Sequence, residues 1–166
     1  MFNFESRHWL FLGDCVLLIV AQFSVTMASK GSNANKPVKI VAIGDGTVGK
    51  TSMLVSYSKG EFPDDYVPTV FENYRTQIAT NQGEITLDIW DTAGQEEYDD
   101  MRRLAFHNVD VFLVCFSIDN PASLQNLESK WARDISKSES PKAKVCGKLL
   151  SLCTGALCFG NTLVSS

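Results

Sequence analysis

Residues 38–51 read VKIVAIGDGTVGKT. The β-branched run at 38–43 predicts a short strand, and apolar residues at helical spacing within 50–59 predict a helix. Between them, residues 44–51 match the pattern GxxxxGK[ST], which indicates a phosphate-binding loop when a strand precedes it and a helix follows it. A tight strand-to-helix turn with a solvated lysine is the alternative interpretation.

Each part of this pattern has a chemical reason. Glycines let backbone N–H groups turn inward and form an anion-binding nest. A helix that begins near Gly49 directs its positive end at the phosphates. We expect Lys50 to neutralise the β- and γ-phosphates and Thr51 to place its hydroxyl on Mg²⁺. The candidate phosphate-binding residues are therefore Gly44, Asp45, Gly46, Thr47, Val48, Gly49, Lys50 and Thr51.

Composition narrows the class of protein. A chain of 166 residues corresponds to about one domain, and 45% hydrophobic with 20% charged residues excludes wholesale disorder, collagen and a polytopic membrane protein. The net charge of −4 makes nucleic acid a poor candidate for a partner. Five cysteines without regular spacing argue against a disulfide framework or a zinc site, so we expect a reducing, cytoplasmic location.

Strand and helix signals alternate along the middle of the chain. Residues 74–80 and 85–90 predict two strands of a hairpin around 81–83, and the apolar run 109–118 predicts a strand covered on both faces. Asn120 and Pro121 indicate a helix start, followed at helical spacing by Leu124, Leu127, Trp131 and Ile135. This alternation favours an α/β fold with a mostly parallel sheet.

The two ends differ from the middle in composition. We expect residues 1–35 to be an extension outside the fold, although the apolar stretch 9–25 leaves a signal, an anchor or an interfacial helix open. Residues 36–145 form the expected domain. Residues 146–166 are a divergent apolar tail that could donate one strand or have no packing partner.

A second chemical motif follows the predicted strand 85–90. Asp91 stands at its end, where a carboxylate can hold Mg²⁺ through a water. Gly94 offers an unobstructed N–H to a γ-phosphate, and the Gln95 amide can both accept from and donate to an attacking water. We interpret Asp88 as a solvent-facing structural residue, and the acids Glu96, Glu97, Asp99 and Asp100 as a solvated helix start.

Three stretches together resemble the small GTPases of the Ras superfamily, and the middle one resembles the Rho family. They are GDGTVGKT at 44–51, YVPTVFENY at 66–74 and WDTAGQEEYDDMRRLAF at 90–106. The resemblance covers about 38–135 and is specific, because three separate motifs occur in the expected order. It implies the P-loop NTPase fold of a Ras-like G domain, with a mostly parallel sheet, helices on both faces, and an incomplete C-terminal end.

The resemblance also implies roles for the first switch. Phe62 would flank the guanine ring, and Thr69 would bind Mg²⁺ and sense the γ-phosphate. The effector segment would be Tyr66, Val67, Pro68, Thr69, Val70, Phe71, Glu72, Asn73 and Tyr74. Phe62 as a plain loop anchor, and Tyr66, Val70 and Phe71 as core residues of a strand edge, stay open as alternatives.

For the second switch the resemblance implies Asp91, Thr92, Ala93, Gly94 and Gln95. Gln95 would orient the water, with Lys50 and Thr69 completing the catalytic set, while Thr51, Thr69 and Asp91 would form the Mg²⁺ set. Gly46 occupies the position where a side chain would crowd Gln95, and Thr47 stands where relatives often carry alanine, which we expect to be tolerated. We expect Arg102 and Arg103 to pair with the neighbouring acids and His107 to be structural.

The sequence departs from the family at its C-terminal end. It has no [NT]KxD motif and no SAK-like loop to read guanine, and no Asp or Glu follows Glu139. The last helix, the short helical insert of Rho proteins and a cysteine for lipidation are also missing. Loss of a bidentate carboxylate contact to the base would weaken nucleotide affinity by ~30- to 1000-fold and reduce discrimination against adenine.

Three functions follow as hypotheses. The first is a monomeric Rho-type switch that binds GTP and GDP with Mg²⁺, hydrolyses GTP slowly, and meets exchange factors, GTPase-activating proteins and effectors, without nucleic acid. The second is a truncated, catalytically inactive fragment that acts as a partner-binding decoy or is a non-functional product. The third is another P-loop enzyme that uses ATP.

Overall fold

The computed structural model describes residues 36–60, 62–63, 67–80, 83–117, 119–140 and 143–150. The predictions for residues 1–35, including the apolar stretch 9–25, lie outside these ranges, as do Tyr66 and residues 151–166. Within the described part of the chain, no helix is both long enough and apolar enough to cross a bilayer.

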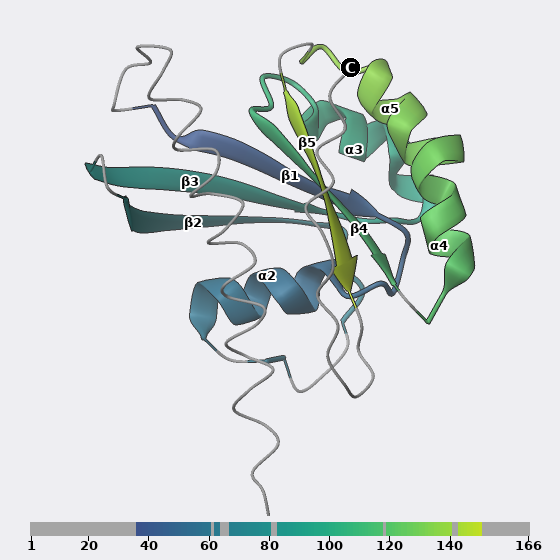
Figure 1. Ribbon diagram of the computed structural model, residues 1–166, viewed down its shortest axis with the longest axis horizontal. Coiled ribbons are helices and arrows are strands. Elements are labelled where there is room, and N and C mark those ends of the chain that lie inside the picture. The colour runs from purple at the N-terminus through teal and green to yellow at the C-terminus, as the bar shows by residue number, and fades with distance from the viewer. Residues whose placement is uncertain are drawn as a thin grey trace, which may run out of the picture.

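A five-stranded sheet forms the centre of the molecule, in the order β2-β3-β1-β4-β5 (Figure 1). The central strand β1 (Val38–Gly44) pairs in parallel with β3 (Gly83–Thr92) and with β4 (Val111–Ser117). The edge strand β5 (Lys144–Leu150) is parallel to β4, and β2 (Phe71–Thr80) is antiparallel to β3. The sheet is therefore mostly parallel, as the sequence predicted, and the hairpin of β2 and β3 is confirmed.

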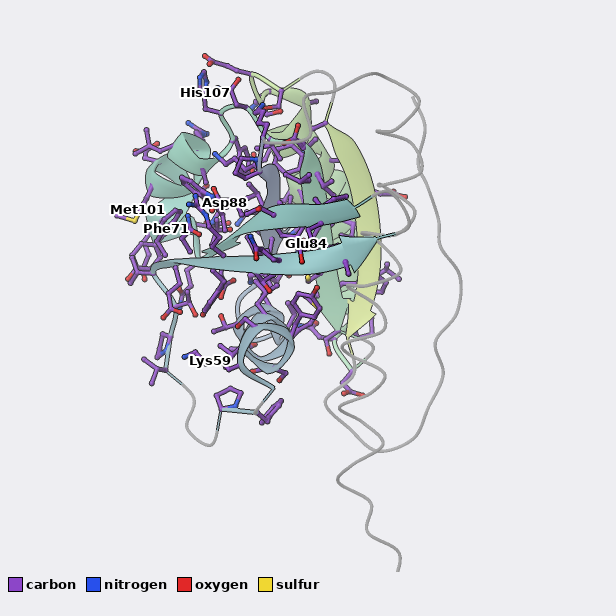
Figure 2. All side chains as sticks on the ribbon, turned by 90° about the vertical axis from the view of Figure 1, so that its left-hand side faces the viewer. Lys59, Phe71, Glu84, Asp88, Met101 and His107 are labelled. Carbon is purple, nitrogen blue, oxygen red and sulfur yellow. The ribbon has the colours of Figure 1, made fainter. Side chains whose placement is uncertain are left out.

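Helices cover both faces of the sheet. The helix α2 (Lys50–Lys59) lies on one face, and the other carries α3 (Asp99–Ala105), α4 (Pro121–Asn126) and α5 (Ala132–Ser136) (Figure 1). In Figure 2, Lys59 on α2 and His107 beyond α3 lie on opposite sides of the sheet. A short 3₁₀ turn η1 (Glu96–Tyr98) precedes α3, and a π-helical turn η2 (Leu127–Trp131) joins α4 to α5.

Strand alternation in β1 divides the core into two layers. Ile40 and Ala42 face α2 and pack with Met53 and Leu54, whereas Val41 and Ile43 belong to the layer on the other face. This second layer contains Phe106, Phe112 and the fully buried Trp131. Because β1 is buried on both faces, its sequence is nearly all apolar, as expected of a central parallel strand.

Residues 146–150 of the predicted tail form part of a strand, which was one of the two alternatives for the tail. These residues belong to β5, which pairs with β4 from Val111↔Lys144 to Ser117↔Leu150. The strand β4 therefore lies between β1 and β5 rather than at an edge. Cys115 of β4 is fully buried and not disulfide-bonded, which confirms its interpretation as a small core residue.

The prediction that Leu124 begins the apolar face of the helix is wrong. Leu124 is 49% exposed, whereas its neighbour Ser123 is buried at 1%. The Ser123 hydroxyl accepts a hydrogen bond from the Ser117 amide at 2.9 Å and donates to the Asn120 carbonyl at 2.7 Å. These bonds turn Ser123 inward, and the next residue, about 100° further round the helix, faces solvent. Asn120 caps α4 by position only, because its side chain makes no capping bond.

Substitutions at these two neighbouring positions have opposite expected outcomes. Ser123→Ala leaves the half-buried Ser117 amide without its acceptor and lowers the free energy of unfolding by about 1–2 kcal/mol. Leu124→Gln changes it by less than about 0.5 kcal/mol, because the side chain is already in solvent. Urea denaturation of both variants measures the difference, and a larger loss for Leu124→Gln than for Ser123→Ala would contradict this packing.

Candidate nucleotide-binding site

The loop between β1 and α2 is built on two glycines that no other residue could replace without distortion. Gly44 has φ 142°, and a Cβ added there would lie 2.1 Å from the Cys115 carbonyl oxygen of the neighbouring strand. Gly49 precedes α2 with φ 96° and provides no side-chain cap to the first turn. The positive end of α2 therefore faces the loop without a protein acceptor from that residue.

Lys50 lies inside this loop and not in solvent. Its side chain is 6% exposed, and Nζ donates to the Gly44 carbonyl at 2.9 Å and to the Asp45 carbonyl at 2.7 Å. Burial lowers the pKa of Lys50, an effect that the nearby Cys115 and Asp91 partly offset. This placement excludes the alternative of a solvated lysine beside a plain turn.

Asp91, at the end of β3, presents a buried carboxylate without a partner of normal geometry. The residue is 0% exposed, and neither Oδ1 nor Oδ2 accepts a hydrogen bond. Burial raises the pKa of Asp91 to about 6, although Thr51, Lys50 and the Thr92 amide lie near enough to lower it. A buried polar group without a partner is rare in native proteins, and a bound water or ion is one way to complete it.

The Thr51 hydroxyl lies next to this carboxylate and contacts a second hydroxyl, that of Thr69. Thr51 Oγ1 at the start of α2 is 2.5 Å from Thr69 Oγ1, which comes from the segment before β2. Mg²⁺ prefers oxygen ligands and is usually held by one or two carboxylates together with phosphates of the substrate. The donor set of Thr51, Thr69 and Asp91 fits that ion. Within the described residues, no cluster of three or more His, Cys, Asp or Glu side chains forms a rival metal site.

The remaining loop residues have distinct environments. Val48 is 2% exposed and belongs to the core under the loop. Thr47 adopts φ 63°, a left-handed conformation that is strained for a β-branched residue. The structure therefore accommodates the threonine, but in a conformation that costs conformational energy.

The residues predicted to form the second switch pack directly onto the predicted phosphate loop. A Cβ at Gly94 would lie 2.3 Å from the Gly46 amide nitrogen and 2.4 Å from the Gly44 carbonyl oxygen. A Cβ at Gly46 would lie 3.8 Å from Cγ of Gln95, an ordinary van der Waals contact, so the two positions are neighbours and the predicted crowding of Gln95 stays a prediction. Gln95 itself is exposed, beside the loop. Thr92 is buried and donates to the Ala42 carbonyl at 2.7 Å, which ties the end of β3 to β1.

Arg102 has a role that the sequence did not indicate. It pairs with Asp99, as expected, but it is only 2% exposed and its guanidinium also donates to the carbonyls of Ala93 and Gln95. Arg102 thus holds the backbone of residues 93–95, the predicted second switch. Arg103 pairs with Asp100 at 3.6 Å in the expected way, and His107 contacts Glu139 at the surface.

The described part of the first switch is largely exposed. Val67 and Val70 are 71% and 44% exposed, so the alternative that Val70 is a core residue is wrong. Phe71 is half-buried and packs edge-to-face on Trp90 with ring centroids 5.2 Å apart. The Tyr74 hydroxyl donates to Glu72, and burial with this bond raises the pKa of Tyr74.

Phe62 is 41% exposed and has further interactions within the structure, so both a loop anchor and a ring-flanking residue stay open. Asp88 is half-buried, accepts from the Trp90 indole at 3.1 Å and pairs with Arg75. Asp88 is therefore a structural residue whose carboxylate contacts side chains of the sheet and does not only face solvent.

A cavity of about 580 Å³ opens beside the phosphate loop. Gly46, Gly94 and Gln95 form one wall, and Asn126 and Arg133 belong to the opposite wall on the α4–α5 segment. The predicted phosphate loop and second switch therefore share one depression of the surface.

Comparisons with known proteins agree with this geometry. A sequence model of the Ras family matches residues 39–151, which is more than half of the chain. The chain belongs to the Ras family.

Relatives within that family include Rho proteins. The chain is 50% identical over 97 residues to Rho-related GTP-binding protein RhoB of Homo sapiens, covering 58% of this chain and 50% of that protein. It is 49% identical over 110 residues to Ras-like GTP-binding protein RHO1 of Entamoeba histolytica, covering 66% of this chain and 51% of the relative. The chain spans about half the length of these relatives. The predicted resemblance to a Rho-type small GTPase is confirmed.

The burial of the Asp91 carboxylate predicts how the stability of the ligand-free chain depends on pH. Its pKa of about 6 lies above the usual value of 3.8, so the folded state binds the proton more tightly and stability falls as the pH rises from about 4 to 6. Asp91→Asn removes that penalty. We expect the free energy of unfolding of Asp91→Asn at pH 7.5, without nucleotide, to be about 1–3 kcal/mol higher than that of wild type. Between pH 4 and 6 we expect the stability of the variant to stay constant where that of wild type falls.

Asp88→Asn is the matched control for this measurement by urea denaturation. Asp88 lies on the same strand but has Trp90 and Arg75 as partners, so this variant gains no stability. A ligand-free Asp91→Asn chain no more stable than wild type at pH 7.5 would contradict an uncompensated carboxylate.

Proposed function

We propose that this chain binds GTP and GDP together with Mg²⁺ and acts as a Rho-type switch that hydrolyses GTP. The observation that carries the proposal is the buried, unpartnered Asp91 carboxylate, which lies at the strand end next to the contacting hydroxyls of Thr51 and Thr69. A neighbouring loop already holds a buried ammonium, that of Lys50. This arrangement suits a nucleotide phosphate bound with a divalent cation.

The chain's own groups have separable tasks in this function. Lys50 places its positive charge in the loop, where two carbonyls fix its position and a further N–H can reach a phosphate oxygen. Mg²⁺, when bound, neutralises charge on the β- and γ-phosphates. The Gly94 amide lies against the phosphate loop and can donate to the γ-phosphate, so the segment after it responds to the presence of that group.

Hydrolysis requires a positioned water. Gln95 is exposed at the mouth of the cavity, and its amide can accept a hydrogen bond from water while it donates another. Arg102 binds the carbonyls of Ala93 and Gln95 and thereby restricts the backbone that carries the amide. Its guanidinium is engaged with these carbonyls and with Asp99, so a fast reaction needs a cation from an accessory protein in trans.

Signalling through the first switch is the second half of the proposal. Exchange factors, GTPase-activating proteins and effectors are expected partners, because the relatives are Rho proteins. Val67 and Val70 expose apolar surface in this segment, and Phe62 adds more before it. Exposed apolar side chains near a phosphate sensor suit a partner that distinguishes two nucleotide states.

Binding of a fluorescent GTP analogue to the purified chain tests the proposal. We expect saturable, Mg²⁺-dependent binding with Kd below ~10 μM. Lys50→Ala should weaken it by at least ~100-fold, because the phosphates lose a buried charge-assisted donor. The exposed Lys59, at the far end of α2, is the matched control, and Lys59→Ala should leave Kd unchanged.

Other outcomes separate the alternative functions. Absence of binding by wild type at 1 mM nucleotide would overturn the proposal and favour a chain that binds partners without nucleotide. Displacement of the analogue by ATP as well as by GTP would leave nucleotide binding intact but remove guanine specificity, as the missing base-reading motif predicts.

A further inference from the structure

The phosphate loop carries a carboxylate where an anion is expected to bind. Asp45 stands between Gly44 and Gly46, and a negative charge there disfavours phosphate unless it is compensated. Its two oxygens are both engaged away from Lys50. Oδ2 accepts from the Asn126 side-chain amide at 2.7 Å, and Oδ1 accepts from the Trp131 indole N–H at 2.7 Å. The charge is thus directed at the α4–η2 segment.

The π-helical turn makes this double contact possible. Asn126 and Trp131 are five residues apart, and in a regular α-helix such residues point about 140° apart around the axis. In η2 (Leu127–Trp131) the i→i+5 pattern closes the turn on residues five apart, so both donors face the same side. Irregular turns of this kind are frequent at functional sites.

Trp131 also contacts the residues that hold the second switch. Its ring is fully buried and lies 4.8 Å from the Arg102 guanidinium and 4.9 Å from Lys130 Nζ. Arg102 donates to the carbonyls of Ala93 and Gln95, and Lys130 pairs with Glu96 at 3.5 Å. One indole therefore joins the phosphate loop to the segment that contains Gln95.

We propose that Asp45, Asn126 and Trp131 are positioning residues that hold the phosphate loop in its nucleotide-binding conformation and slow nucleotide release. The inference rests on the proposed nucleotide-binding function. Lys50 fixes the Gly44 and Asp45 carbonyls from inside the loop, and the Asp45 carboxylate fixes the loop from its other side. Without the second attachment a loop rich in glycine samples more conformations, and a smaller fraction of the molecules binds nucleotide tightly.

Dissociation rates of a fluorescent GDP analogue, chased with excess GDP, test this in the whole chain. Trp131→Phe keeps an aromatic ring beside Arg102 but removes the indole N–H, and we expect release to be about 3- to 10-fold faster. Asn126→Asp places two carboxylates against each other and should accelerate release by about 10-fold or more. Adding Asp45→Asn to Asn126→Asp restores an amide–carboxylate pair with reversed direction and returns the rate to within about threefold of wild type.

Two control variants separate positioning from general instability and from charge. Phe106→Leu weakens the same apolar layer without touching Asp45, and Gln125→Glu adds a negative charge beside Asn126 on an exposed residue that does not line the cavity. Neither should change the release rate by more than about twofold. When the melting temperatures of all variants are measured, we expect Phe106→Leu to lower Tm at least as much as Trp131→Phe does.

The possible outcomes test the positioning role separately from the proposed nucleotide binding. No binding by wild type overturns the proposed function and this inference with it. Binding by wild type with equal release rates in Trp131→Phe, or no rescue in the double variant, overturns the inference alone. Faster release in Phe106→Leu equal to that in Trp131→Phe also overturns it, because stability would then explain the effect.

Discussion

The structure depends on a buried ammonium held between two carbonyls of one loop, with a buried carboxylate at the end of the next strand. Lys50 reaches the Gly44 and Asp45 carbonyls from the first residue of α2, and Asp91 ends β3 opposite Ala42 of β1. The parallel pairing of β1 with β3 and β4 brings their carboxyl ends to the same edge of the sheet. In open α/β sheets this edge is where ligands bind. The charged groups are stable there because the apolar layers of α2 and Trp131 fix the strands from both faces.

Several residues of the candidate site lower the stability of the ligand-free fold or restrict its sequence. Asp91 has a raised pKa because water is excluded from its carboxylate, and Thr47 adopts a left-handed conformation that a β-branched residue rarely takes. Gly94 is so close to the phosphate loop that no side chain fits. Under the proposed function, Asp91 would hold the cation and Gly94 would contact the phosphate, which gives these two residues a role beyond stability. Local violations of this kind are expected at functional sites in an otherwise consistent fold.

The sequence predicted those features that depend on local pattern and on motifs. The helix at 50–59, the hairpin, the burial of Cys115 and the placement of Asp91 at a strand end all follow from periodicity and spacing. It did not predict the burial of Arg102, the exposure of Leu124 or the attachment of Asp45 to Trp131. These depend on how far the segment 121–136 is rotated. Ser123 influences that rotation through local bonds to Ser117 and Asn120, whereas Asn126 and Trp131 contact Asp45, which is distant in sequence. The apolar tail was ambiguous because only pairing with β4 makes residues 146–150 a strand.

Thermal unfolding of the wild-type chain with and without GDP and Mg²⁺ tests the central claim most directly. If the ligand completes Lys50 and Asp91, GDP with Mg²⁺ at about 100 times its Kd should stabilise the fold by about 2.7 kcal/mol and raise Tm in a concentration-dependent way. Chelation of the cation by EDTA should remove most of this rise. An unchanged Tm at millimolar GDP and Mg²⁺ would contradict the account.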